Sequence, residues 1–280
     1  MDSKQYQVNQ DNSEFWTELC GTSFAQEHGI RNADKESLAL FDKAFFDYYP
    51  FALDYLNSIE FNNSEVVEIG LGYGTVGEWL AKRSKHYTGV DISKGPVAML
   101  NHRLKQNNLS TNHQAIQANA LALPFEDNSK DYIVSIGCLH HTGDLSSALK
   151  ETIRVCRPGG KILIMIYHKH SLRSLAAPLI YFACRLANVF NVGPKIPHHY
   201  DEFLRWQRDS RLDGSPPPAT EFSSFHSIDK IMPNCKIIKK GLHNLGKFKI
   251  PLTSIKCRPF FLGWLDRIVG LDIYFIAQKN

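Results

Sequence analysis

Three closely spaced glycines, Gly70, Gly72 and Gly74, follow a short apolar run at residues 66–69. Glycine allows a tight turn and lets a ligand approach the backbone closely. If a helix begins at this turn, its free amide groups can donate hydrogen bonds to the ligand. The turn therefore predicts a site for a nucleotide-like ligand at the end of a strand.

Asp91 is the predicted acidic partner of this turn. It ends the apolar segment 87–90, about 20 residues after the first glycine, where a carboxylate can bind ribose hydroxyls. The alternative is that Asp91 only caps the following helix. A dinucleotide fingerprint would have its third glycine at position 75, where this sequence has Thr75. The spacing favours an adenosine ligand without a pyrophosphate over a dinucleotide.

Two adjacent histidines, His140 and His141, are candidates for a general base. They follow the apolar segment 132–136, and ligands of open α/β sheets bind at the carboxyl ends of strands. Histidine ordinarily titrates near pH 6.5, which suits a base at neutral pH. Tyr167 and His168, after the next apolar segment, are second candidates. The alternative for all four is packing or the ordering of loops.

The elements that must position these residues alternate between strand and helix. Strands are expected at 66–69, 87–90, 113–117, 132–136 and 161–167, and helices at 37–55, 75–84, 96–108 and 145–156. Asp144 would cap the last of these helices, and Pro158-Gly159-Gly160 would stop it. The alternation predicts an α/β fold whose parallel sheet has helices on both faces. Sheet pattern returns at 235–238 and 273–277.

Five segments occur in an order that resembles the class I S-adenosylmethionine-dependent methyltransferases. They are VVEIGLGYG (66–74), GVDIS (89–93), NALALPFEDNSKDYIVS (119–135), LHH (139–141) and RVCRPGGKILI (154–164). The chain is similar to the UbiE-like small-molecule branch, with weaker matches at 15–21 and 165–172. The resemblance implies a Rossmann-like, mostly parallel seven-stranded sheet with an N-terminal helical lid and an insertion after the fifth strand.

The resemblance also implies site residues for S-adenosylmethionine, and no metal. Those expected around the methionine portion and the ribose are Gly70, Leu71, Gly72, Gly74, the supporting Glu68, and Asp91 on the ribose hydroxyls. Those expected around the adenine and sulfonium are Ile92, Asn119, Ala120, Leu121 and Gly137. The family usually has aspartate where this chain has Asn119, but an asparagine carbonyl can also accept the adenine N–H.

The expected domain organisation has four parts. They are a helical leader or lid at 1–63, a cofactor-binding core at 64–170, an insertion or acceptor cap at 171–234, and C-terminal strands at 235–280.

A basic run between Lys236 and Arg258 is interpreted as a solvated face, with an anionic acceptor or a membrane surface as the alternative. The apolar segment 260–265 would pack on the core, line an acceptor tunnel or touch lipid.

Composition excludes several classes of protein. The chain has 280 residues, of which 43% are hydrophobic, and a net charge of +4 that indicates no nucleic-acid partner. Its six cysteines form no CxxC pair, which argues against structural zinc and favours free thiols in the cytoplasm. The polar N-terminus indicates no signal peptide, and the apolar stretch 172–190 is too interrupted for a confident span.

The predicted function is methyl transfer from S-adenosylmethionine to a small molecule, apolar or natural-product-like. The alternatives are an S-adenosylmethionine-binding protein without turnover and an NAD-dependent oxidoreductase. DNA amino-methyltransferases usually carry two prolines after the fourth strand, where this chain has Gly137-Cys138-Leu139-His140. The sequence does not identify the acceptor, the accepting atom or the oligomeric state.

Overall fold

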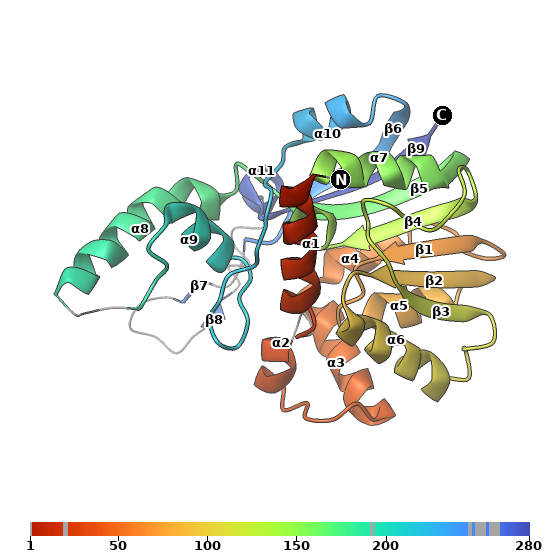
Figure 1. Cartoon of the computed structure of the whole chain (residues 1–280), viewed down its shortest axis with the longest axis horizontal. Helices are drawn as coiled ribbons and strands as arrows, with labels where there is room; N and C mark the ends of the chain where they lie inside the picture. The colour runs from red at the N-terminus through yellow and green to blue at the C-terminus, as the bar shows by residue number, and fades with distance from the viewer. Residues whose placement is uncertain are drawn as a thin grey trace.

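A seven-stranded sheet forms the centre of the molecule in the computed structural model, which describes residues 2–18, 22–190, 192, 194–245, 248–249, 256–257 and 264–280 (Figure 1). The strand order is β3-β2-β1-β4-β5-β9-β6. The strands are β1 (Glu65–Ile69), β2 (His86–Asp91), β3 (His113–Gln117), β4 (Lys130–Ile136), β5 (Cys156–Tyr167), β6 (Cys235–His243) and β9 (Asp272–Lys279). A separate two-stranded sheet pairs β7 (Phe248–Lys249) with β8 (Lys256–Cys257).

The first five strands are parallel, and β9 runs antiparallel between β5 and β6. This arrangement confirms the predicted Rossmann-like, mostly parallel seven-stranded sheet. β6 and β9 are longer than the segments expected from the sequence. β5 also begins earlier than expected, at Cys156, so that the Pro158-Gly159-Gly160 stretch belongs to an irregular start of the strand.

Helices cover both faces of the sheet (Figure 1). One face packs against α4 (Pro50–Leu56), α5 (Thr75–Ala81) and α6 (Lys94–Gln106), and the other against α7 (Leu145–Val155) and α10 (Phe225–Ile231). Neighbouring strand residues alternate between these two cores: Val66 joins the first and Val67 the second. Asp144 caps α7 as predicted, since its side chain accepts from the Ser147 amide at 2.9 Å.

The helix expected at 37–55 is two helices in the structure. α3 (Lys35–Tyr48) ends just before Pro50, and α4 starts there. Proline lacks an amide hydrogen and its ring obstructs the preceding turn, but it fits the first turn of a new helix. The break is therefore a local effect of one residue on a pattern that is otherwise continuous.

The N-terminal leader contains α1 (Ser3–Phe15) and α2 (Thr22–Glu27). α1 lies across the carboxyl ends of the central strands (Figure 1). Its side chains bond to the loops that leave the sheet: Asn12 Nδ2 donates to the His141 carbonyl at 2.7 Å, and Ser13 Oγ donates to the Ile92 carbonyl at 3.0 Å. These contacts place a leader helix directly over the sheet edge.

The segment after β5 holds α8 (Leu172–Val189) and α9 (Tyr200–Trp206), neither of which was among the expected helices. The two helices project from the body of the molecule (Figure 1) and pack on each other through Ala177 and Phe203. Leu179 and Phe182 of α8 are exposed to solvent. No helix in the described parts of the chain combines the length and apolar character needed to cross a membrane. The described C-terminal part also contains α11 (Asp266–Val269).

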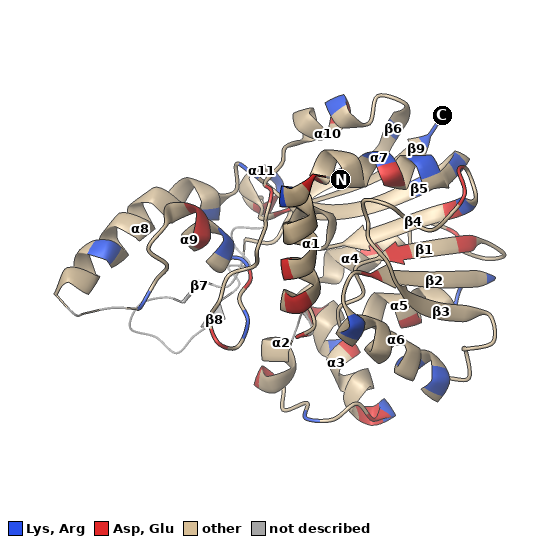
Figure 2. Cartoon of the chain, viewed as in Figure 1, with Lys and Arg blue, Asp and Glu red and all other residues tan. Residues whose placement is uncertain are grey.

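Charged residues of both signs are interspersed on the helices. Figure 2 shows Lys or Arg together with Asp or Glu on α3, α7 and α9. Lys247 and Arg258 of the predicted basic run, and residues 260–263 of the apolar segment, lie outside the described residues. The four cysteines whose side chains are described, Cys138, Cys156, Cys184 and Cys235, are free thiols.

Candidate functional site

A cavity lies at the carboxyl ends of β1, β2 and β4, where the strand order changes direction between β1 and β4. Open α/β sheets bind ligands at this switch point. The free volume of this first cavity is about 780 Å³. The predicted residues that line it are Gly70, Leu71, Gly72, Asp91, Ile92, Asn119, Ala120, Gly137 and His141. α1 closes one side with Asn9 and Asn12, and Trp16 follows directly after the helix.

The glycine turn joins the end of β1 to the start of α5. Gly70, Gly72 and Gly74 have φ angles of 85°, 48° and 78°, a region that side-chain-bearing residues rarely adopt. A Cβ added to Gly70 would lie 2.2 Å from Cβ of Cys138 in the neighbouring loop. Glycine is therefore required at position 70 both for its backbone conformation and for the close approach of the β4 loop.

Gly74 was expected to lie beside the methionine portion and the ribose of the ligand, but it lines neither this cavity nor the second cavity described below. A Cβ at this position would come within 2.8 Å of Cδ of Arg103. The fully buried Arg103 guanidinium forms ion pairs with Asp42 at 3.0 Å and Glu78 at 2.9 Å. Gly74 thus leaves room for an arginine that ties α6 to α3 and α5.

Asp91 connects the β2 loop to the glycine turn. Its Oδ2 accepts from the Leu71 amide and its Oδ1 from the Ser93 amide, both at 2.9 Å. The carboxyl group is 9% exposed, and burial raises the pKa of Asp91 to about 6. Ser93, not Asp91, is the residue that precedes α6. Asp91 is therefore a carboxylate held at the cavity wall rather than the cap of that helix.

Glu68 lies beneath the glycine turn and is 2% exposed. It accepts a hydrogen bond from the Tyr87 hydroxyl, and it contributes to a second cavity rather than to the first. Burial raises the pKa of Glu68 to about 8, and the nearby Asp91 carboxylate acts in the same direction. At neutral pH this carboxyl is therefore mostly neutral and supports the turn as a hydrogen-bonding group.

Asn119 and Ala120 line the first cavity beyond β3. Oδ1 of Asn119 accepts from the Leu121 amide at 2.9 Å, so the side chain shapes its own turn. Leu121 lines neither cavity and packs against the core on the α7 side of the sheet.

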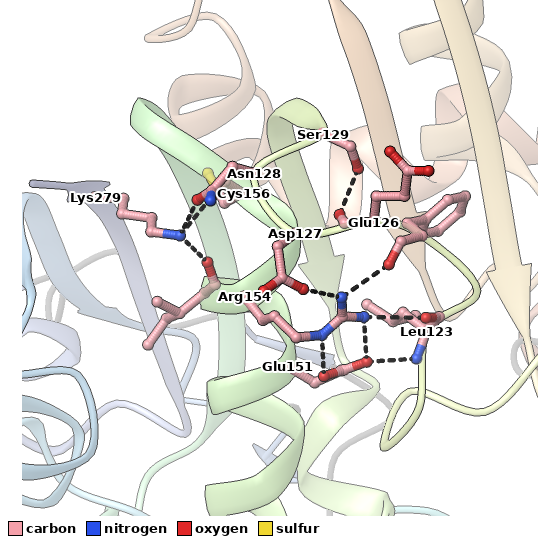
Figure 3. Close-up of polar contacts among 11 residues, drawn as sticks. Leu123, Glu126, Asp127, Asn128, Ser129, Glu151, Arg154, Cys156 and Lys279 are labelled. Atoms are coloured by element: carbon pink, nitrogen blue, oxygen red, sulfur yellow. Dashed lines mark hydrogen bonds and ion pairs between the residues drawn. The ribbon is translucent and has the colours of Figure 1, made fainter.

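The loop that follows is fixed by Arg154 of α7 (Figure 3). The guanidinium pairs with Glu151 at 2.7 Å and Asp127 at 2.6 Å, and it also donates to the Phe125 and Leu123 carbonyls at 2.8 and 3.1 Å. The arginine of the RVCRPGG segment therefore holds the LPFED segment in place. Two of the segments that carry the family resemblance are thus one structural unit.

The second cavity lies on the other side of the glycine turn and has a free volume of about 1330 Å³. It shares Trp16, Ile136 and the turn residues 70–72 with the first cavity. Its aromatic wall comes from the leader, α3 and the α3–α4 junction: Phe15, Phe24, Phe41, Phe45 and Tyr49. Its polar end comes from residues 208–211, which follow α9. Residues 208–211 could not be assigned to a site from the sequence, since no motif surrounds them.

Two of the predicted catalytic residues meet at Asp209 of this polar end. The Tyr167 hydroxyl donates to Oδ2 of Asp209 at 2.7 Å, and Nε2 of His141 lies 3.4 Å from the same oxygen. The other ring nitrogen of His141, Nδ1, is 3.0 Å from the Ala219 carbonyl oxygen. Residues from three separate parts of the chain thus form one cluster.

The other two histidines do not reach a cavity. His140 is fully buried against the Tyr167 and His141 rings, and no hydrogen-bond partner for its ring nitrogens is present among the described residues. Burial holds the pKa of His140 well below its usual range, so the ring stays neutral. His168 is also buried, with Nδ1 3.1 Å from the Gly270 carbonyl. Within the described residues, no group of three or more His, Cys, Asp or Glu side chains could hold a metal ion.

Comparisons with known proteins agree with this geometry. Residues 67–164 match the sequence profile of a family described as a methyltransferase domain. A ubiquinone biosynthesis O-methyltransferase of Coxiella burnetii is 27% identical over 190 residues, which cover 62% of this chain and 78% of that protein.

Solved structures show the same fold. A chain from the complex between the Haloferax volcanii Trm112 methyltransferase activator and a methyltransferase has a TM-score of 0.59 at 15% identity, covering 85% of this chain and 93% of that one. An S-adenosylmethionine-dependent methyltransferase of Aquifex aeolicus has a TM-score of 0.51 at 14% identity, covering 88% and 99%. Together with the glycine turn, the acidic end of β2 and the family match, these findings exclude the oxidoreductase alternative. Residues 67–164 of this chain form a domain of the S-adenosylmethionine-dependent methyltransferases.

Proposed function

We propose that the first cavity binds S-adenosylmethionine and that the second binds a small-molecule acceptor. The observation that carries this proposal is the wall common to both cavities, formed by Trp16, Ile136 and residues 70–72. Methyl transfer is an in-line displacement at a carbon that the sulfonium already activates, so the protein must chiefly align two reactants. Two cavities that meet at one wall provide such an alignment.

Within the first cavity, Asp91 is the proposed ligand of the ribose hydroxyls. Each of its oxygens already accepts one backbone amide, and a carboxylate oxygen can accept a further hydrogen bond. Residues 70–72 would lie along the methionine portion, with Gly137 beneath the sulfonium. Ile92, Asn119 and Ala120 would enclose the adenine. All of these positions line the cavity, which supports the assignment.

The acceptor that fits the second cavity best has an aromatic or apolar body and a hydroxyl group. Phe24, Phe41 and Phe45 offer the body an aromatic wall, against which rings stack favourably. Asp209 at the opposite end can accept a hydrogen bond from a hydroxyl. The Coxiella burnetii relative is named an O-methyltransferase, which agrees with a hydroxyl as the accepting group.

The test is the variant Asp91→Ala, assayed by calorimetry with S-adenosylhomocysteine and by methyl transfer to a panel of phenols. Loss of charged hydrogen bonds should weaken binding by about 1.5–3 kcal/mol, or roughly 10- to 150-fold in Kd. Asp229→Ala, which removes an exposed carboxylate from α10, serves as the control and should bind normally. Unchanged affinity in Asp91→Ala would contradict the ribose assignment.

A further inference from the structure

Asp209 occupies a position that no sequence motif indicates. It follows α9 in the insertion and lines the polar end of the second cavity. Its Oδ2 accepts from the Tyr167 hydroxyl at 2.7 Å and faces Nε2 of His141 at 3.4 Å. Among the described residues, no donor forms a hydrogen bond with Oδ1 of Asp209. One oxygen of the carboxylate is therefore held by the protein, and the other can accept a ligand proton.

His141 is not arranged as a free base in this cluster. Its Nδ1 lies 3.0 Å from the Ala219 carbonyl oxygen and 3.1 Å from the Thr220 hydroxyl oxygen, so this nitrogen is already engaged by the protein. The other nitrogen, Nε2, faces the carboxylate of Asp209, which is also an acceptor. Because both ring nitrogens already face protein groups, neither is directed at a ligand, and the ring is a positioning residue beside Asp209.

Asp209 also lies beside the boundary between the two cavities. His141 lines the first cavity, and its ring centroid is 4.8 Å from that of Trp16, which lines both. Asp209 lines only the second. A hydroxyl hydrogen-bonded to Asp209 would therefore lie close to the wall through which the methyl group must pass.

Other charged groups surround this carboxylate and will contribute to any pH dependence. The Arg208 guanidinium lies 5.5 Å from the centre of the Tyr167 ring and donates to Ser171 and Ser174. Arg211 pairs with Glu18 at 3.3 Å on the same side of the cavity. The buried Asp272 interacts with both Arg208 and Asp209, and burial raises the pKa of Asp272 to about 7.

We propose that Asp209 is the general base that accepts the proton of the acceptor hydroxyl, an inference that rests on the proposed function of the two cavities. The hydroxyl oxygen forms the bond to the methyl carbon as the carbon–sulfur bond breaks, and that electron pair stays on sulfur. The hydroxyl proton moves to Oδ1 of Asp209. The products are the methyl ether, S-adenosylhomocysteine and a neutral Asp209 carboxyl, which then releases its proton to water. Tyr167 and His141 are positioning residues.

The central experiment compares Asp209→Asn with the wild-type enzyme, using 4-nitrocatechol as the acceptor and methyl-labelled S-adenosylmethionine. Asparagine keeps the size of the side chain but cannot take the proton. The kcat should fall by about 10²–10⁴-fold, the range for general-base catalysis. The KM for the acceptor should change far less, and calorimetry should show unchanged affinity for S-adenosylhomocysteine. Asp209→Glu should restore part of the lost rate.

Two further variants separate catalysis from folding. Asp213→Asn removes another carboxylate from the same loop, one that bonds only to Ser215 among the described residues, and it should leave kcat unchanged. Tyr167→Phe removes the hydrogen bond to Oδ2 and should lower kcat by less than Asp209→Asn does. It should leave the KM for the acceptor and the affinity for S-adenosylhomocysteine near their wild-type values, a split between kcat and KM that a loss of folding would not produce.

The outcomes distinguish this inference from the function on which it rests. Wild-type kcat in Asp209→Asn would overturn the role of Asp209 and leave the two-cavity proposal intact. A wild-type enzyme that binds S-adenosylhomocysteine but does not methylate 4-nitrocatechol would overturn the assignment of an aromatic hydroxyl proton to Asp209. A third outcome concerns the cofactor cavity. If the wild-type enzyme turns over normally and Asp91→Ala binds S-adenosylhomocysteine as tightly as wild type does, the assignment of the first cavity to the cofactor would be overturned.

Discussion

The two cavities that meet at Trp16 and the glycine turn are built in different ways. The first is lined mostly by turns that directly follow β1, β2, β3 and β4, and most of these turns belong to one stretch of about a hundred residues. The second combines the leader, α3, the glycine turn and residues 208–211 of the insertion. Backbone geometry determines the first cavity, and packing between distant segments determines the second.

The difference teaches where specificity can change in such an enzyme. A turn such as the one at Gly70 is constrained by its φ angle and by the Cys138 loop, so few sequences can form it. The aromatic wall of the second cavity needs only side chains of suitable size, and many combinations can supply these. We therefore expect substitutions in the first cavity to affect every acceptor equally, and those in the second to affect the choice of acceptor.

The largest expected effect belongs to Gly70→Ala. The new Cβ would lie 2.2 Å from Cβ of Cys138, and position 70 has a positive φ, so the turn must move. Affinity for S-adenosylhomocysteine should fall by more than about 100-fold, equivalent to about 3 kcal/mol. Gly159→Ala is the matched control, because Gly159 also has a positive φ but its Cβ would meet nothing within 4 Å.

Calorimetry and thermal unfolding of the two glycine variants separate loss of binding from loss of stability. The control should unfold at a somewhat lower temperature, since backbone strain at positive φ costs about 1–2 kcal/mol, but it should bind normally. Equal binding by Gly70→Ala and wild type would mean that the turn adapts, and the contrast between the two cavities would then be wrong.

Much of the first cavity could be predicted because its residues are local. Asp91 is the last residue of β2, and the glycine turn, Asn119 and Gly137 each follow a strand within one or two positions. Strand periodicity can be recognised in a single sequence. Gly74 and Leu121, which the resemblance also implies, line neither cavity. Gly74 is needed for the packing of Arg103, and that arginine is 29 positions further along the chain.

The second cavity could not be predicted in the same way. Asp209 and Tyr167 are 42 residues apart, and Asp209 and His141 are 68 apart, so only the packed fold brings them together. α9, just before Asp209, was not among the expected helices, since Pro and Gly on both sides obscure its short pattern. The leader was predicted to be helical, but the contacts of its aromatic residues depend on how α1 crosses the sheet.

A moderate effect is expected for Trp16→Ala, which alters the wall between the cavities. Loss of the aromatic contacts should weaken S-adenosylhomocysteine binding by about 0.5–1.5 kcal/mol, roughly 2- to 12-fold, and should raise the acceptor KM as well. Hydrogen exchange at residues 70–74 should become faster, because the leader would close the site less often.

Tyr6→Ala is the control for Trp16→Ala, since Tyr6 lies on α1 but is 59% exposed. It should change neither binding nor exchange. If exchange at residues 70–74 stays at the wild-type rate in Trp16→Ala, the leader does not act as a lid. An effect on only one ligand would show that Trp16 belongs to one cavity rather than to their common wall.

The smallest effect concerns Glu68, whose buried carboxyl supports the turn from the side of the second cavity. Its pKa is raised to about 8, so the folded state binds the proton more tightly than the unfolded chain, where a glutamate titrates near 4.5. The stabilisation from this group is complete below about pH 4.5 and is lost as the pH rises through 8.

Glu68→Gln stays neutral at every pH and can still accept from the Tyr87 hydroxyl. The melting temperature of Glu68→Gln relative to wild type should therefore rise between pH 5 and pH 9, by a few degrees at the upper end. Glu60→Gln, at an exposed site, should show no such trend. Because Asp272 titrates in both proteins without acting on Glu68, its contribution cancels in the difference, and a flat difference would mean that Glu68 is already ionised beneath the turn.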